Sequence, residues 1–169
     1  MPLVELCVED PRWDGLGLAA WAETAATATL RHLNLPEDHF SISAMGCNAA
    51  RISALNADFR GKPSPTNVLS WPSEDRAAEI IGAHPDRPEG CADDPAELGD
   101  IAICYDTCMQ EAADQHKTPG DHVTHLMVHA TLHLLGYDHI EDEDAALMEA
   151  LETEILAKLG IADPYLCDV

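Results

Sequence analysis

The chain has 169 residues, 46% of them hydrophobic, with 31 acidic against nine basic side chains and a formal net charge of −22. This length fits one globular domain, and no apolar run in the sequence is long enough to cross a membrane. The negative charge argues against a protein that wraps nucleic acid through general phosphate attraction, because the long-range interaction would be repulsive.

The N-terminal half predicts alternating strands and helices. Residues 3–8 alternate apolar and polar side chains as a strand does, and the Ala- and Leu-rich residues 13–33 predict a helix. A second strand is expected at 40–44. Residues 48–59 carry apolar side chains at helical spacing, and a Pro-rich loop then leads into a strand at 67–71.

The C-terminal half begins with residues 73–97, which are rich in acids and prolines and lack periodicity, so we expect an exposed acidic loop. A compact apolar strand at 98–104 and helices at 105–116, 121–135 and 142–159 follow. Together the elements predict an α+β fold. We expect a single domain, residues 1–169, in which a mixed sheet of about four strands packs against about five helices.

The cellular compartment is suggested by the N-terminus and the cysteines. MPLVELCVEDPRW has no basic segment followed by an apolar one, so we expect no signal peptide and a cytoplasmic protein. Scattered cysteines in a reducing compartment are most simply free thiols. Cys104 and Cys108 are close enough in sequence to share a metal, but two buried thiols is the simpler interpretation. The six cysteines are Cys7, Cys47, Cys91, Cys104, Cys108 and Cys167.

Six of the nine histidines lie between residues 116 and 139. His129 and His133 are four residues apart on the helix predicted at 121–135, so both side chains lie on one face and can bind one ion. His125 would lie about 12 Å along the axis from His133 and is disfavoured as a third ligand. His139 can fold back instead, because Gly136 allows a turn at the helix end.

Three imidazoles with one open coordination position are typical of a catalytic rather than a structural zinc site. Spacing alone leaves zinc, nickel and iron open, although imidazole ligands favour zinc. Ala130 follows His129, so the glutamate that acts as general base in the metalloprotease motif H-E-x-x-H is missing. A small zinc metalloprotease therefore remains only the alternative function.

Four segments carry a family resemblance: LNADFRGKPSPTNVLSWP (55–72), LGDIAIC (98–104), HLMVHATLHLLGYDHIEDEDAALMEALETEIL (125–156) and LGIADPY (159–165). In these the chain resembles the YbeY family of bacterial endoribonucleases, also described as ribosomal RNA maturation factors. The family pattern H-G-x-L-H-L-x-G-Y-D-H matches in register, with Ala130 where glycine is usual. The resemblance thus places His129, His133 and His139 at the family's metal-ligand positions.

The resemblance implies a metal-dependent hydrolase of single-stranded RNA that acts in 16S ribosomal RNA 3′-end maturation and ribosome quality control. The partners that it implies are the 16S ribosomal RNA precursor and the small ribosomal subunit or its associated proteins. We expect one Zn²⁺ per chain, with nickel or another divalent transition metal as an alternative, and no membrane association. Arg60 corresponds to the family's functionally important arginine, and its planar guanidinium suits a phosphate. The predicted catalytic set is therefore Arg60, His129, His133 and His139.

The chain departs from the family at Pro63 and Ser64, where an acid and a polar or basic residue are usual, and in the longer segment 73–97. Among other polar residues, Asp138 either orients a ligand imidazole or caps its turn. Asn67 and Ser70 are expected in the cleft. The acidic charge keeps a third function open, a ribosome assembly factor with a structural metal.

Overall fold

The computed structural model describes residues 2–61 and 64–165. Pro63 and Cys167, named above, lie outside these residues. The elements, in chain order, are β1 (Val4–Val8), the 3₁₀ helix η1 (Pro11–Trp13), α1 (Leu18–His32), the 3₁₀ helix η2 (Glu37–His39), β2 (Phe40–Cys47), α2 (Ala49–Arg60), β3 (Val68–Pro72), β4 (Ala96–Cys104), α3 (Tyr105–Asp114), α4 (Pro119–Leu134) and α5 (Asp142–Lys158).

The expected α+β class is confirmed, with one four-stranded mixed sheet and five α-helices in the described residues. The first helix starts later than the sequence suggested. Trp13 ends η1, and Gly15 and Gly17 then take positive φ values of 82° and 107°, which an α-helix excludes. The helix therefore begins at Leu18, while β2 runs three residues beyond its expected end.

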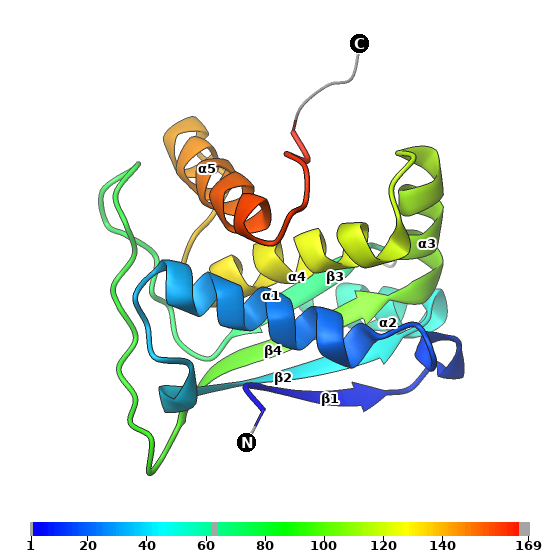
Figure 1. Cartoon of the computed structure of the whole chain (residues 1–169), viewed down its shortest axis with the longest axis horizontal. Coiled ribbons are helices and arrows are strands. Elements are labelled where there is room, and N and C mark those ends of the chain that lie inside the picture. The colour runs from blue at the N-terminus through cyan, green and yellow to red at the C-terminus, as the bar shows by residue number, and fades with distance from the viewer. Residues whose placement is uncertain (1, 62–63, 166–169) are drawn as a thin grey trace.

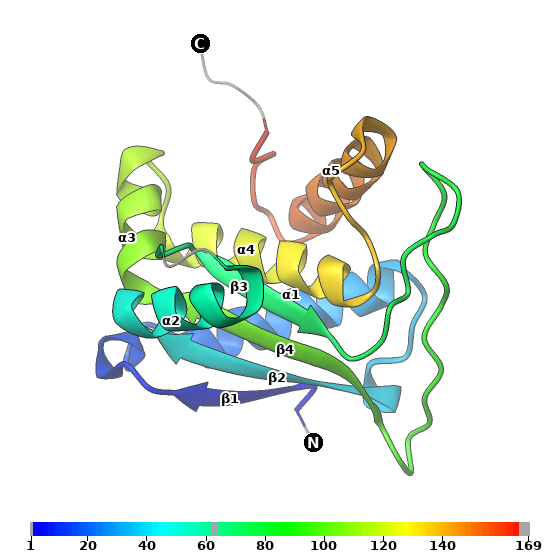
Figure 2. The same ribbon diagram turned by 180° about the vertical axis from the view of Figure 1, so that it is seen from behind.

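The sheet has the strand order β1-β2-β4-β3. β1 pairs with β2 and β2 with β4 in parallel, whereas β3 joins β4 antiparallel and forms an edge of the sheet. Side chains of β4 alternate between the two faces: Ile101 and Ile103 enter the large core beneath α1 and α4, and Ala102 and Cys104 enter a smaller core with α2. Figures 1 and 2 show these helices on opposite faces.

Helix α4 crosses the middle of the large core. Thr118 caps its N-terminus, accepting a hydrogen bond from the Asp121 N–H, and Pro119 occupies the first turn, where no intrahelical donor is needed. Ten of its sixteen residues are buried. The helix ends before Gly136, whose φ of +103° turns the chain out of the core.

The chain between β3 and β4 runs along the outside of the molecule but is attached to it at several points. Arg76 is only 7% exposed, and its Nη1 donates to the Leu134 carbonyl at the end of α4 (3.0 Å). Farther along, Gly82 N–H donates to Asp144 of α5 at 2.8 Å. This segment therefore supports the turn that follows α4. Within the described residues, no helix has the length and apolar character needed to span a membrane.

Candidate metal centre

Three histidines from α4 and the following turn converge on one point. His129 and His133 lie one turn apart on α4, and the chain reversal at Gly136 returns His139 beside them. One ligand nitrogen from each ring lies within 4.8 Å of the others. The ring centroids are 4.6 to 5.3 Å apart. The structure thus brings together the three residues singled out by spacing.

Hydrogen bonds fix which nitrogen of each α4 imidazole faces the centre. His129 Nδ1 lies 3.0 Å from a carboxylate oxygen of Glu152, and His133 Nδ1 lies 2.9 Å from the Tyr137 carbonyl oxygen. The Tyr137 carbonyl oxygen can only accept a hydrogen bond, and the same holds for the Glu152 carboxylate in its ionised form. Each Nδ1 therefore carries the proton. Both Nε2 atoms then present lone pairs toward the centre.

The two Nε2 atoms lie 3.1 Å apart, a distance at which facing lone pairs repel unless a cation is shared between them. Burial, together with the charges of His129 and His139, lowers the pKa of His133 to about 4, which favours the neutral imidazole of that residue. The donor set therefore fits a transition-metal ion, for which neutral imidazole is a common ligand.

Glu152 lies beneath this cluster on α5 and is fully buried. Burial raises the pKa of its carboxyl, but hydrogen bonds from His125 and His129 lower it by more, to about 2. Its other neighbour is the Tyr165 hydroxyl, at 2.9 Å from Oε2. The carboxylate is therefore ionised, and each of these three groups donates to it.

His125 turns toward Glu152, with its Nε2 2.9 Å from Oε1, and takes no part in the three-histidine cluster of the described residues. This agrees with the helical distance argument. The sequence reasoning missed Glu152, although one signal was available. Glu152 follows Met148 by four residues and precedes Ile155 by three, so it occupies the apolar face of α5. A charged side chain is rarely buried there unless it is paired.

The histidines lie in a cleft of about 590 Å³ between α4, β3 and the turn after α4. Asn67 and Ser70 line it, as expected. Asp138 also lies there, but its Oδ1 accepts from the backbone N–H groups of His139 (2.6 Å) and Ile140 (3.2 Å). Asp138 therefore caps the turn, the second of the two roles weighed for it.

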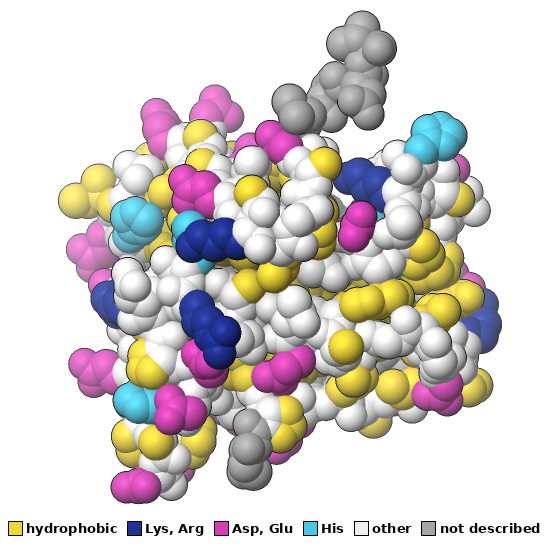
Figure 3. All heavy atoms as spheres, viewed as in Figure 1, with side chains coloured by type: hydrophobic (Ala, Val, Ile, Leu, Met, Phe, Trp, Pro, Cys, Tyr) yellow, Lys and Arg dark blue, Asp and Glu magenta, His cyan; other side chains and the backbone are white. Residues whose placement is uncertain are grey.

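Arg60 lines the same cleft from the end of α2 and is exposed. The other arginine in the lining, Arg76, is buried and donates to the Leu134 carbonyl. Among the described residues that line the cleft, Arg60 is therefore the arginine that a bound anion can reach. Figure 3 shows acidic side chains scattered over one face of the molecule.

Cys104 and Cys108 are buried free thiols and belong to no metal-binding group in the described part of the chain. Burial raises the pKa of the Cys108 thiol, which favours its neutral form. Its Sγ lies 3.8 Å from the Asn67 carbonyl oxygen. The simpler interpretation of this pair, as core residues, agrees with the structure.

Comparison with known proteins shows the same family along nearly the whole chain. The family model described as "Endoribonuclease YbeY" matches residues 9–160. Two curated proteins of that name are 52% identical (Ruegeria sp. strain TM1040; 98% of each chain) and 58% identical (Cereibacter sphaeroides; 97% of this chain and 99% of the relative). The solution structure of TM1509 from Thermotoga maritima shares the fold, with a TM-score of 0.54 at 18% identity over 97% of this chain and 99% of the other. This chain belongs to the Endoribonuclease YbeY family.

Proposed function

We propose that this protein is a metal-dependent endoribonuclease that hydrolyses phosphodiester bonds in single-stranded RNA, with a role in 16S ribosomal RNA 3′-end maturation and ribosome quality control. The observation that carries the proposal is the convergence of His129, His133 and His139 in a cleft that also holds the exposed Arg60. Membership of an endoribonuclease family supports RNA as the substrate class.

A metal ion held by three imidazoles would lower the pKa of a bound water toward ~7 and polarise a phosphoryl oxygen. The protein's own residues supply the remaining parts. The Tyr137 carbonyl orients the His133 imidazole by accepting from its Nδ1. Arg60 offers a planar, always charged guanidinium that can bind a phosphate through two parallel hydrogen bonds and stabilise the charge that develops during cleavage.

The charges in the cleft explain how an acidic protein can bind RNA locally. Two arginines in the lining face three carboxylates, those of Glu74, Asp75 and Asp138. A divalent cation at the histidines would offset this negative charge, including that of the buried Glu152 carboxylate beside His129, so the cleft would repel a phosphate less with the metal bound than without it. The long-range interaction of the whole protein with the RNA backbone is repulsive at a net charge of −22. We therefore expect recognition of a few nucleotides rather than a long duplex.

Zinc is the proposed metal, at one ion per chain, because neutral imidazole nitrogens suit it and three protein ligands with an open position are typical of catalytic zinc. Nickel fits the same donors. The proposed partners are the 16S precursor and the small ribosomal subunit or its associated proteins, in the cytoplasm. The net charge favours one further candidate, an assembly factor whose metal is structural.

Zinc-loaded protein incubated separately with single-stranded RNA, duplex RNA and casein tests the proposal. We expect cleavage of single-stranded RNA alone, and loss of that cleavage after chelation with recovery on adding zinc. His133→Ala, prepared in parallel, controls for contaminating nucleases and should be inactive. Casein cleavage would identify a metalloprotease. Intact RNA together with full metal occupancy would favour the assembly factor.

A further inference from the structure

Helix α5 packs on the side of α4 that faces away from the sheet (Figure 1) and buries a carboxylate between the two helices. Glu152 has no exposed surface. Its Oε1 lies 2.9 Å from His125 Nε2 and 3.0 Å from His129 Nδ1, and its Oε2 lies 2.9 Å from the Tyr165 hydroxyl. One side chain thus connects α4, α5 and the C-terminal segment.

Packing alone gives no reason for a charge at this position. Met148, Leu151, Ile155 and Leu156 surround Glu152 on the buried face of α5, so an apolar side chain would continue the core. Removing a carboxylate from water is unfavourable unless hydrogen bonds replace the hydration. Three donors do so here, and two of them belong to histidines on α4. The arrangement points to a task that involves those histidines.

The task follows from the chemistry of imidazole. A neutral histidine carries one proton, and the partner of one ring nitrogen decides whether the other can bind a metal. For His133 the backbone carbonyl of Tyr137 fulfils this role, so no side chain is required. For His129 the acceptor is a side chain, that of Glu152.

We propose that Glu152 is a positioning residue of the metal centre: its carboxylate holds His129 with the proton on Nδ1, so that Nε2 faces His133 and the metal. This inference rests on the metal site of the proposed function. The same carboxylate accepts from His125 and attaches the C-terminal segment through Tyr165, which lines the cleft. Partners of this kind typically contribute about 10- to 100-fold to metal affinity.

The first test uses the parent protein without metal. Long-range ¹H–¹⁵N spectra of the imidazoles, recorded at a pH where the rings are neutral, identify the protonated nitrogen of each histidine. We expect His129 to carry its proton on Nδ1. A proton on Nε2 would overturn the proposal, and this result requires no variant to fold.

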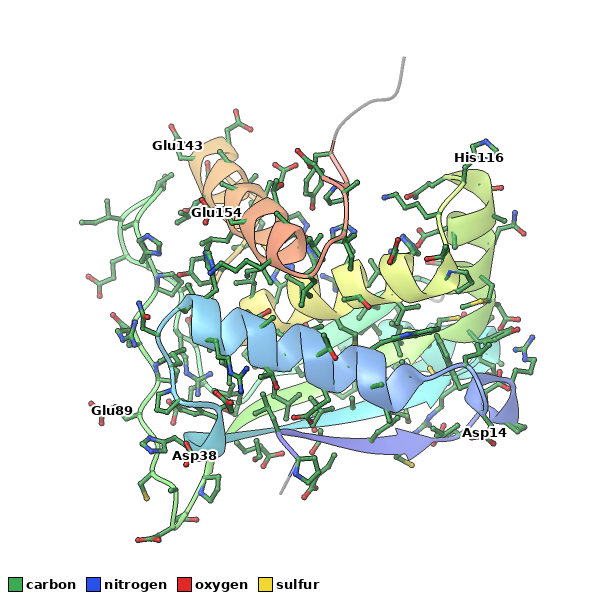
Figure 4. All side chains as sticks on the ribbon, viewed as in Figure 1. Asp14, Asp38, Glu89, His116, Glu143 and Glu154 are labelled. Carbon is green, nitrogen blue, oxygen red and sulfur yellow. The ribbon has the colours of Figure 1, made fainter. Side chains whose placement is uncertain are left out.

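The second test compares zinc affinity among variants by competition with a chromogenic chelator. Glu152→Leu keeps a core of similar volume but removes both acceptor oxygens, so zinc should bind roughly 10- to 100-fold more weakly. Glu152→Gln keeps one carbonyl acceptor and should recover part of the affinity. Glu154→Gln, on the same helix and labelled in Figure 4, removes an exposed charge and should bind zinc as the parent does.

A purely structural role predicts a different pattern, in which Glu152→Leu changes the thermal stability of the metal-free protein and leaves its zinc affinity at the parent value. That pattern would overturn the proposal. Tyr165→Phe removes only the hydroxyl donor and leaves the contact with His129, so its zinc affinity should fall less than that of Glu152→Leu. Neither readout uses RNA. A parent that binds zinc but cleaves no RNA would therefore contradict the proposed function alone.

Discussion

Nε2 of His133 lies 3.1 Å from Nε2 of His129, one turn away on α4, and both Nδ1 atoms are engaged elsewhere. A metal bound between them therefore depends on both rings. We expect the purified protein to contain about one transition-metal ion per chain, most readily zinc. His133→Ala should lose it, as elemental analysis after dialysis would measure.

His39→Ala serves as the control for this prediction, because His39 lies on the distant η2 and is absent from the three-histidine cluster. It should retain the parent's metal content. Full occupancy in His133→Ala would mean that another residue completes the coordination, and the assignment of three histidines would then be wrong.

A second prediction separates His139 from His125. His139 reaches the centre from the turn, whereas His125 lies on the same helix but donates to Glu152. His139→Ala should therefore weaken zinc binding far more than His125→Ala, since only the first substitution removes a nitrogen that coordinates the metal. Isothermal titration of the two metal-free variants measures the difference. The reverse order of affinities would require His125 to be the third ligand.

Local sequence signals were sufficient for most of the fold. Helix α4 has a side-chain cap at Thr118, a proline in its first turn and a terminal glycine, and each signal acts within a few residues. The start of the helix expected at 13–33 was wrong, because Gly15 and Gly17 adopt positive φ values that an α-helix excludes. Strand order was not predicted, since pairing between distant segments depends on packing that periodicity does not contain.

The site divides along the same line. His129 and His133 are related by helical spacing, so the sequence alone could pair them. Glu152 contacts His129 from a separate helix, 23 residues later in the chain. Arg76 precedes Leu134 by 58 residues and donates to its carbonyl. Such contacts exist only after α5 and the segment before β4 have packed. Family resemblance, not spacing, singled out Arg60.

The turn that carries His139 gives a third prediction. Gly136 has a φ of +103°, and a Cβ there would lie 2.7 Å from backbone atoms of Arg76. Gly136→Ala should therefore cost about 1–3 kcal/mol for the strained conformation and roughly as much again for the steric overlap. Displacing the turn also moves His139, so zinc should bind more weakly. Urea unfolding and zinc titration measure the two effects.

Gly160→Ala is the matched control, because Gly160 also has a positive φ, of +77°, but a Cβ there meets nothing within 4 Å. It should show the conformational cost alone and leave zinc affinity unchanged. Equal stability losses in the two variants would show that the contact with Arg76 does not constrain the turn.

Arg60→Ala tests the phosphate-binding part of the mechanism. Arg60 is exposed at the end of α2, so its loss should lower the free energy of unfolding by less than about 1 kcal/mol. Metal content should not change, because Arg60 is not among the three clustered residues. Cleavage of single-stranded RNA should fall by on the order of 10²-fold or more, since the described residues that line the cleft include no other exposed arginine to stabilise the developing charge.

Two further variants decide what Arg60 contributes. Arg60→Lys keeps the positive charge but loses the two parallel donors, so it should recover only part of the cleavage rate. Arg51→Ala removes a cation from the same helix, where Arg51 pairs with Glu9 outside the cleft, and should cleave RNA as the parent does. If Arg51→Ala and Arg60→Ala lose activity equally, the loss reflects the net charge of the protein and not a phosphate held beside the histidines. If Arg60→Ala cleaves at the parent rate with its metal in place, Arg60 has no part in the reaction, and the phosphate must be bound by the histidine centre alone.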